Sequence, residues 1–117
     1  MSVVSWVVEV ELKPGKEDDF RALMEEMVES TKTEPGTQAY EWFFSDDGSR
    51  CHIYERYADS EAMISHVGGF MEKFAGRFMG AGDVKRFTVY GSPSAEGKKA
   101  LEAFGGTYMA QRGGFAR

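Results

Sequence analysis

A predicted β-hairpin is the feature of this sequence that most limits how the chain can fold. Residues 37–45 and 49–58 are two runs rich in Tyr, Trp, Phe and Ile, with Asp47-Gly48 between them. An Asp-Gly pair between two such runs is a strong signal for a tight hairpin loop. If these two residues form the loop, the numbers of paired residues sum to 95. This register puts Tyr40–Glu55, Trp42–Ile53 and Phe44–Cys51 on one side of the sheet, and Phe43–His52, Glu41–Tyr54 and Ala39–Arg56 on the other.

Two further strands are predicted outside this hairpin. Residues 3–12 alternate, and one face of the segment is fully apolar. This period of two is typical of a strand, and Pro14-Gly15 ends it. Residues 83–91 form the other predicted strand. The apolar face of the first strand consists of Val4, Trp6, Val8, Val10 and Leu12.

The segments between the strands have a helical period. Residues 16–33 form a predicted helix that ends before Pro35. Asp59 or Ser60 can cap a second helix, which Gly68-Gly69 is expected to interrupt near Val67. A second helical stretch then carries three phenylalanines at four-residue spacing, namely Phe70, Phe74 and Phe78.

The C-terminal part extends beyond the last predicted strand. Ser92-Pro93 is expected to open a short helix, with Pro at its first position, and Gly105-Gly106 to end it. The tail from Tyr108 to Arg117 has little periodicity. We expect one domain over 1–117, with a core over about 3–91 and an extension over 92–117.

The element order predicts an α+β fold of the ferredoxin-like, split βαβ type. Strand, helix, strand, strand, helix, strand is the βαββαβ pattern, here with an extra C-terminal helix. Right-handed crossovers place both main helices on one face of an antiparallel sheet and leave the other face open. Because that open face carries aromatic and apolar side chains, we expect a homodimer through it, forming a dimeric α+β barrel. The side chains concerned are Val3, Val7, Phe43 and Tyr54.

Composition excludes several classes of protein. The net charge of −5 and the pI near 5.0 argue against a nucleic-acid partner. The apolar runs are too short for a membrane span. Cys51 is the single cysteine, so no intrachain disulfide is possible, and the cytoplasm is the expected location. Cys51 and the two histidines, His52 and His66, are too few for a Cys/His structural zinc site. No metal ligands are assigned, although carboxylates could contribute to a site of another kind.

His66 and Glu55 are the candidate catalytic residues. His66 lies on the apolar stripe of its helix and should point toward the sheet. There it is either a buried, hydrogen-bonded core residue or a general base in a pocket. Glu55 shares its predicted sheet face with apolar and aromatic residues, where an unpaired carboxylate is costly. It is either satisfied locally or the orienting partner of His66.

A set of aromatic residues suits either a plain core or a cavity for a flat ring. Core packing is the commoner use of such a set, and it is the alternative to a substrate-binding role. The glycines form no phosphate-binding or dinucleotide-binding motif, so no recognisable flavin or nicotinamide site is predicted. The candidate substrate-binding residues are Tyr40, Trp42, Trp6, Phe70 and Phe74.

Three segments in order resemble the antibiotic biosynthesis monooxygenase family, and in particular its quinol monooxygenase members. They are Val8 to Gly15, Glu34-Pro35-Gly36 followed by Tyr40, and Glu55 to Ala62 followed by His66. The resemblance covers about residues 3–91 and implies a dimeric α+β barrel. It also implies a cofactor-free monooxygenase that oxidises a quinol or polycyclic phenol with molecular oxygen.

The resemblance assigns roles to the candidate residues. His66 would be the base or polar anchor and Glu55 its partner, with Tyr40, Trp42 and Trp6 as pocket walls. Relatives that degrade haem use Asn, Trp and His at positions held here by Val8, His66 and Gly76, so that function does not carry over. Two alternatives stay open: a non-catalytic dimer that binds a small apolar ligand, and an isomerase or cyclase of a related aromatic substrate.

Overall fold

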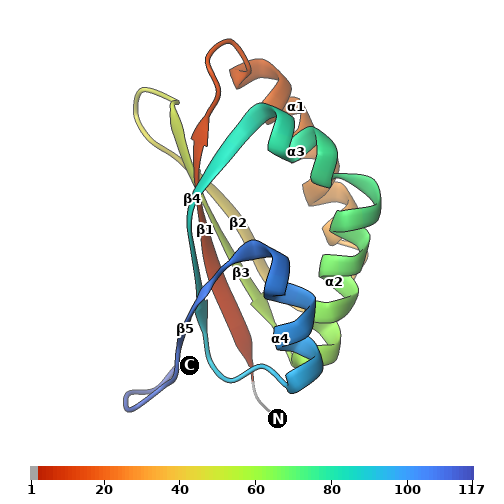
Figure 1. Cartoon of the computed structure of the whole chain (residues 1–117), viewed down its shortest axis with the longest axis vertical. Coiled ribbons are helices and arrows are strands. Elements are labelled where there is room, and N and C mark those ends of the chain that lie inside the picture. Colours follow the sequence, from red (N-terminus) through yellow and green to blue (C-terminus); the bar gives the residue numbers. More distant parts are fainter. Residues whose placement is uncertain (1–2) are drawn as a thin grey trace.

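The computed structural model describes residues 3–117, and its helices lie on one face of a single sheet (Figure 1). The five strands are in the order β2-β3-β1-β4-β5, with β1 antiparallel to both β3 and β4. This arrangement confirms the predicted ferredoxin-like α+β fold. The elements are β1 (Val4–Leu12), α1 (Glu17–Thr31), β2 (Thr37–Phe44), β3 (Arg50–Tyr57), α2 (Ser60–Lys73), α3 (Ala75–Ala81), β4 (Gly82–Tyr90), α4 (Ala95–Leu101), the 3₁₀ helix η1 (Glu102–Phe104) and β5 (Thr107–Met109).

The predicted register of the β2–β3 hairpin is confirmed. Tyr40 pairs with Glu55 and Phe43 with His52, so each pair keeps the sum of 95. The loop is wider than two residues, because the N–H of Gly48 donates to the carbonyl of Ser45 at 2.9 Å. Gly48 has a φ of +75°, which a glycine adopts without strain. The register therefore places the predicted side chains on the predicted faces.

The predicted interruption of the second helix at Gly68-Gly69 is wrong. Helix α2 runs unbroken from Ser60 to Lys73, and Asp59 caps it by accepting from the N–H of Ala62 at 2.9 Å. Each glycine in a helix interior costs only about 1 kcal/mol relative to alanine. Burial of one face of the helix offsets this cost. The break falls instead at Phe74, whose φ of −127° and ψ of −20° separate α2 from α3.

The C-terminal extension differs from its prediction at both ends. Helix α4 begins at Ala95 and is capped by Ser94, whose hydroxyl accepts from the N–H of Gly97 at 3.0 Å. The helix therefore begins two residues after Pro93, the first position that the sequence predicted. In the tail, the three-residue strand β5 pairs parallel to β4, and so short a strand leaves no periodicity to detect. Gly106 allows this pairing, because a Cβ there would lie 2.7 Å from the ring of Phe87.

Two hydrophobic clusters fill the space between the sheet and the helices. One gathers side chains of α1 and α3 around Phe20, and the other gathers those of α2 and α4 around Met63. Both phenylalanine and methionine are 0% exposed. Val8, at the centre of β1, packs against both clusters. The helix-covered face is therefore where an internal cavity can form.

The opposite face of the sheet has no helix over it (Figure 1). Phe43 and Tyr90 are 55% and 43% exposed, and His52 lies 3.6 Å from Glu9 there. Within residues 3–117, no helix combines the length and the apolar character that crossing a bilayer requires.

Candidate active site

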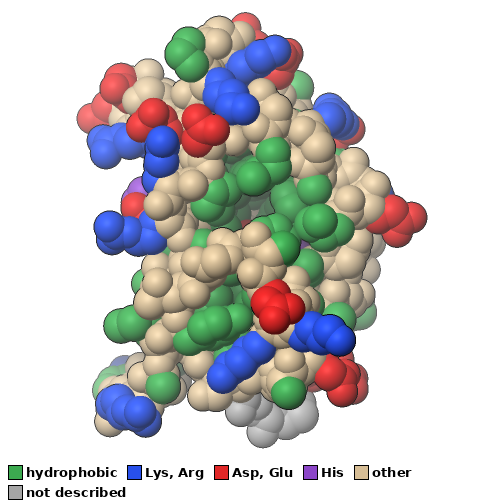
Figure 2. All heavy atoms as spheres, viewed as in Figure 1, with side chains coloured by type: hydrophobic (Ala, Val, Ile, Leu, Met, Phe, Trp, Pro, Cys, Tyr) green, Lys and Arg blue, Asp and Glu red, His purple; other side chains and the backbone are tan. Residues whose placement is uncertain are grey.

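A cavity of about 260 Å³ lies between the sheet and the helices. Figure 2 shows the molecule hollowed on this side, with hydrophobic side chains gathered around the hollow. The walls are almost entirely apolar, and the polar side chains among them come from three residues, Tyr40, Glu55 and His66. Side chains of Trp6, Val8, Met27, Ile53, Val67, Phe70, Phe78, Met79, Val84, Phe87, Leu101, Ala103 and Phe104 complete the lining.

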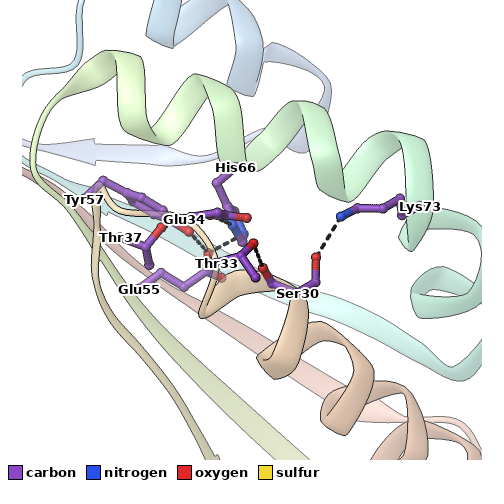
Figure 3. Close-up of polar contacts among 8 residues, drawn as sticks. All are labelled: Ser30, Thr33, Glu34, Thr37, Glu55, Tyr57, His66 and Lys73. Carbon is purple, nitrogen blue, oxygen red and sulfur yellow. Dashed lines mark hydrogen bonds and ion pairs between the residues drawn. The ribbon is translucent and has the colours of Figure 1, made fainter.

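His66 points from α2 toward the sheet, as its position on the apolar stripe predicts (Figure 3). The residue is 7% exposed, and both of its ring nitrogens contact a carboxylate. Nδ1 lies 2.8 Å from Oε1 of Glu34, and Nε2 lies 3.3 Å from Oε1 of Glu55. The imidazole therefore bridges two carboxylates.

Glu55 is buried beside His66, at the polar end of the cavity. Its β3 position pairs with Tyr40 on one side and with Trp6 on the other, so the carboxylate is brought to the helix-covered face by strand alternation. Tyr57, two residues along the same face, donates its hydroxyl to Oε1 of Glu55 at 2.5 Å. Both contacts of the carboxylate, from Tyr57 and from His66, go to Oε1.

Glu34 is a member of the site that sequence reasoning missed as a functional residue. It follows α1 in the turn that leads into β2, and its carboxylate accepts the hydroxyl of Thr37 at 2.9 Å as well as contacting His66. The only signal was its place in the Glu34-Pro35-Gly36 segment of the family resemblance. Its contact with His66 spans 32 residues, which no local pattern reports.

The two carboxylates keep His66 in its protonated form. Burial by itself would lower the pKa of His66, but the contacts with Glu34 and Glu55 and their negative charges outweigh it. The balance of these effects raises the pKa of His66 from 6.5 to about 9. For Glu34, burial opposes ionisation, but the contacts with His66 lower the pKa of its carboxyl below the ordinary value. Near neutral pH the ring is therefore an imidazolium, which donates hydrogen bonds rather than accepting protons.

Two tyrosines enclose the same imidazole. The ring centroids of Tyr40 and Tyr57 lie 5.4 Å and 5.2 Å from that of His66. Burial, followed by the negative charge of Glu55, raises the pKa of both phenols well above the ordinary value. Both tyrosines are therefore neutral hydrogen-bonding groups near neutral pH.

The structure brings most, but not all, of the predicted pocket residues to the cavity. Trp6, Tyr40 and Phe70 line it. Trp42 packs instead against Phe20, with ring centroids 5.6 Å apart, and is not part of the lining. Phe74 lines a smaller recess behind His66. The lining also includes Phe104 and Leu101 of the C-terminal extension, which were predicted only as helix residues.

The arrangement can hold an apolar ligand against one carboxylate–imidazolium pair. Within residues 3–117, no group of three or more His, Cys, Asp or Glu side chains has the arrangement of a metal site. Cys51 is buried on the same sheet face but is not part of the cavity lining, and burial raises the pKa of its thiol to about 12. The polar groups that line the cavity, Tyr40, Glu55 and His66, can donate and accept hydrogen bonds and exchange protons.

Sequence comparison finds a family match over the first part of the chain. The family described as "Antibiotic biosynthesis monooxygenase" matches residues 3–69. A curated protein of Mycobacterium tuberculosis, named "Putative monooxygenase Rv0793", is 32% identical over 56 residues. The match covers 48% of this chain and 55% of that protein, so it spans about half of the length of each.

Solved structures share the fold at low sequence identity. MupZ from Pseudomonas fluorescens superposes with a TM-score of 0.84 at 19% identity, covering 98% of this chain and 94% of that one. The structure of Rv0793 gives a TM-score of 0.66 at 23% identity, with 79% and 96% of the chains covered. SnoaB from Streptomyces nogalater, described as a cofactor-independent oxygenase, gives 0.67 at 12% identity, with 81% and 97% covered. At these identities the likeness concerns the fold alone.

Proposed function

The chain belongs to the antibiotic biosynthesis monooxygenase family, and we propose that it is a cofactor-independent monooxygenase that oxidises a quinol or polycyclic phenol with molecular oxygen. The observation that carries this proposal is the Glu55–His66 pair at the polar end of an apolar cavity. A carboxylate there can take a proton from a phenolic hydroxyl, while the imidazolium balances the charge that results.

The reaction needs no external reductant because the substrate supplies the electrons. A quinol and O₂ give a hydroxyquinone and water, so that one oxygen atom enters the ring and the other leaves as water. Loss of a proton makes the substrate anion a better electron donor to oxygen than the neutral quinol. The protein's part is to hold the ring, accept the proton and exclude water.

The cavity walls support a flat aromatic substrate. Trp6, Tyr40 and Phe70 contribute aromatic side chains to the lining, and Phe87 and Phe104 add two more. Aromatic faces stack well on a planar ring. The volume of about 260 Å³ is slightly below the common range for ligand pockets, about 300–1,000 Å³, and this favours a compact substrate. We keep Glu55 and His66 as the proposed catalytic residues.

We also propose that the working form is a homodimer in the cytoplasm. The open sheet face carries exposed Phe43 and half-buried Val7 and Tyr54, which a second copy would cover. Phe43→Glu should give a folded species of half the mass in sedimentation. A wild-type protein that sediments as the 13.1 kDa chain at micromolar concentration would contradict the dimer.

Oxygen uptake tests the proposed activity. Wild-type protein is given a panel of quinols and anthrones, and is compared with Glu55→Gln, which keeps the shape but removes the acid–base group. We expect uptake above the uncatalysed rate and a loss of about 10²–10⁴-fold in the variant. Glu25→Gln, on the exposed side of α1, is the matched control and should keep full activity.

The other outcomes of this experiment separate the alternatives. Uptake that survives in Glu55→Gln would move the reaction away from this carboxylate. Substrate conversion without oxygen uptake would indicate an isomerase or cyclase. Binding of the aromatic panel with no conversion would indicate a non-catalytic ligand-binding protein.

A further inference from the structure

We infer that Glu34 is a positioning residue of this site: it holds the His66 ring between two carboxylates and leaves Glu55 as the group that meets the ligand. This inference rests on the proposed function for the chemistry of the site. The positioning role of Glu34 can be tested without any turnover, so this role and the proposed activity can fail separately.

The first step concerns the partners of the two ring nitrogens of His66. Nδ1 is hydrogen-bonded to Glu34 at 2.8 Å and Nε2 forms an ion pair with Glu55 at 3.3 Å, so each ring nitrogen already faces a carboxylate (Figure 3). His66 therefore cannot be the base that receives the substrate proton while this arrangement holds. The family resemblance gave that role to His66 as one of two options, and the geometry favours the other one.

The second step is the free oxygen of Glu55. Tyr57 and His66 both contact Oε1, and no hydrogen bond or ion pair from residues 3–117 reaches Oε2, so this oxygen is open to a ligand in the cavity that Glu55 lines. An ionised carboxylate only accepts hydrogen bonds. The group that fits this oxygen is a hydrogen-bond donor, such as the hydroxyl of a quinol, and a ligand carboxylate would be repelled.

The third step is how the fold delivers Glu34 to His66. The turn from Glu34 to Thr37 is closed by the N–H of Thr37, which donates to the carbonyl of Glu34 at 3.2 Å. Gly36 in this turn lies so close to α2 that a Cβ would be 2.5 Å from Cβ of Ala62. Ala62 is one helical turn before His66, so the contact sets the turn against the same stretch of α2. The close packing of the Glu34-Pro35-Gly36 segment on α2 therefore holds the carboxylate of Glu34 against the imidazole of His66.

The titratable groups around the ring come from three elements and the turn. Glu55 and Tyr57 face His66 from β3, Tyr40 from β2, and Glu34 from the turn before β2. Behind Glu34, the ammonium of Lys73 on α2 contributes favourably to ionisation of that carboxyl. Two carboxylates facing one imidazole favour its charged form, and removal of either should make the ring easier to deprotonate.

Proton NMR of the imidazoles gives the decisive test, because the chain has two histidines. In Glu34→Gln we expect the titration midpoint of His66 to fall by at least one pH unit, a tenfold loss of proton affinity. His52 lies on the opposite, open face and is the internal reference, whose midpoint should not move. Glu25→Gln is the matched control and should move neither histidine.

Thr37→Val gives a second route if Glu34→Gln does not fold. It removes the hydroxyl that braces Glu34 without removing a charge, and should lower the midpoint of His66 by less than Glu34→Gln does. An unchanged midpoint in both variants, or a wild-type His66 that titrates near 6.5, would overturn the inference.

Activity gives a further readout that a merely structural role would not move. With a quinol substrate, the alkaline limb of the pH profile for oxygen uptake should shift to lower pH in Glu34→Gln, and Glu34→Asp should restore part of it. A uniform drop in rate with no shift of the profile would contradict a role through the charge of His66. The same shift in Glu25→Gln would contradict the assignment to Glu34.

Discussion

The two histidines of this chain lie on opposite sides of the sheet, and each contacts glutamate. His52 on β3 is 3.6 Å from Glu9, with side chains that are 53% and 33% exposed. His66 on α2 contacts Glu55 and Glu34, with side chains that are 8%, 7% and 25% exposed. The chemical groups are the same, and the environments are not.

The difference teaches what burial adds to an acid–base pair. Water and salt screen the exposed pair, so a contact of this kind contributes only about 0–1 kcal/mol. The side chains of His66 and Glu55 are buried, so water solvates their charges poorly and the two groups depend on one another. The fold makes this contrast by alternation: neighbouring residues of β3 face either the helices or the open side.

The largest expected effect comes from removing each histidine in turn. His66→Ala leaves two carboxylates facing each other without their shared positive charge, and should cost about 3–5 kcal/mol of folding free energy. His52→Ala should change it by no more than about 0.5 kcal/mol. Urea unfolding at equal protein concentration measures both. An equal loss of folding free energy in the two variants would contradict the proposed difference between the buried and the exposed histidine.

The pH dependence of stability should follow the buried histidine. The pKa of His66 is raised in the folded state from 6.5 to about 9, so its contribution is complete below pH 6.5 and is lost as the pH rises through about 9. A shift of this size corresponds to at most about 3–4 kcal/mol. Unfolding free energies measured by urea between pH 6 and pH 9.5 should fall over that window. His66→Gln should flatten the curve, and a curve that is equally steep in this variant would assign the effect to other groups.

The sequence was sufficient for the architecture because local signals agreed with one another. The Asp47-Gly48 loop and the alternation of β2 and β3 set the register, and the register put Glu55 on the helix-covered face. The helical period then pointed His66 toward the same face. The strand period of β3 and the helical period of α2 therefore predict that Glu55 and His66 face each other. Neither period predicts the distance between them.

What the sequence did not reveal depends on contacts between distant segments. Glu34 reaches His66 because Gly36 packs closely on α2, and no spacing in the chain reports that approach. Trp42 was expected in the pocket wall because its strand face was right, but Phe20 of α1 covers it. The helix break was placed at Gly68-Gly69 by propensity, whereas packing of α2 on the sheet kept the helix whole.

The smallest expected effect distinguishes two tyrosines of β3 that lie on opposite sides of the sheet. Tyr57 donates to the buried Glu55 carboxylate at 2.5 Å, whereas Tyr54 is half-buried on the open face. Tyr57→Phe removes a hydrogen bond to a charged acceptor and should cost about 2 kcal/mol, while Tyr54→Phe should cost no more than about 0.5 kcal/mol.

Tyr57→Phe also sharpens the assignment of roles within the site. With one donor lost from Oε1, Glu55 depends more on His66, so the cost of Tyr57→Phe should be greater at pH 9.5 than at pH 7. Urea unfolding of both tyrosine variants at the two pH values measures this coupling. A cost that is the same at both pH values would show that the tyrosine and the histidine stabilise the carboxylate independently.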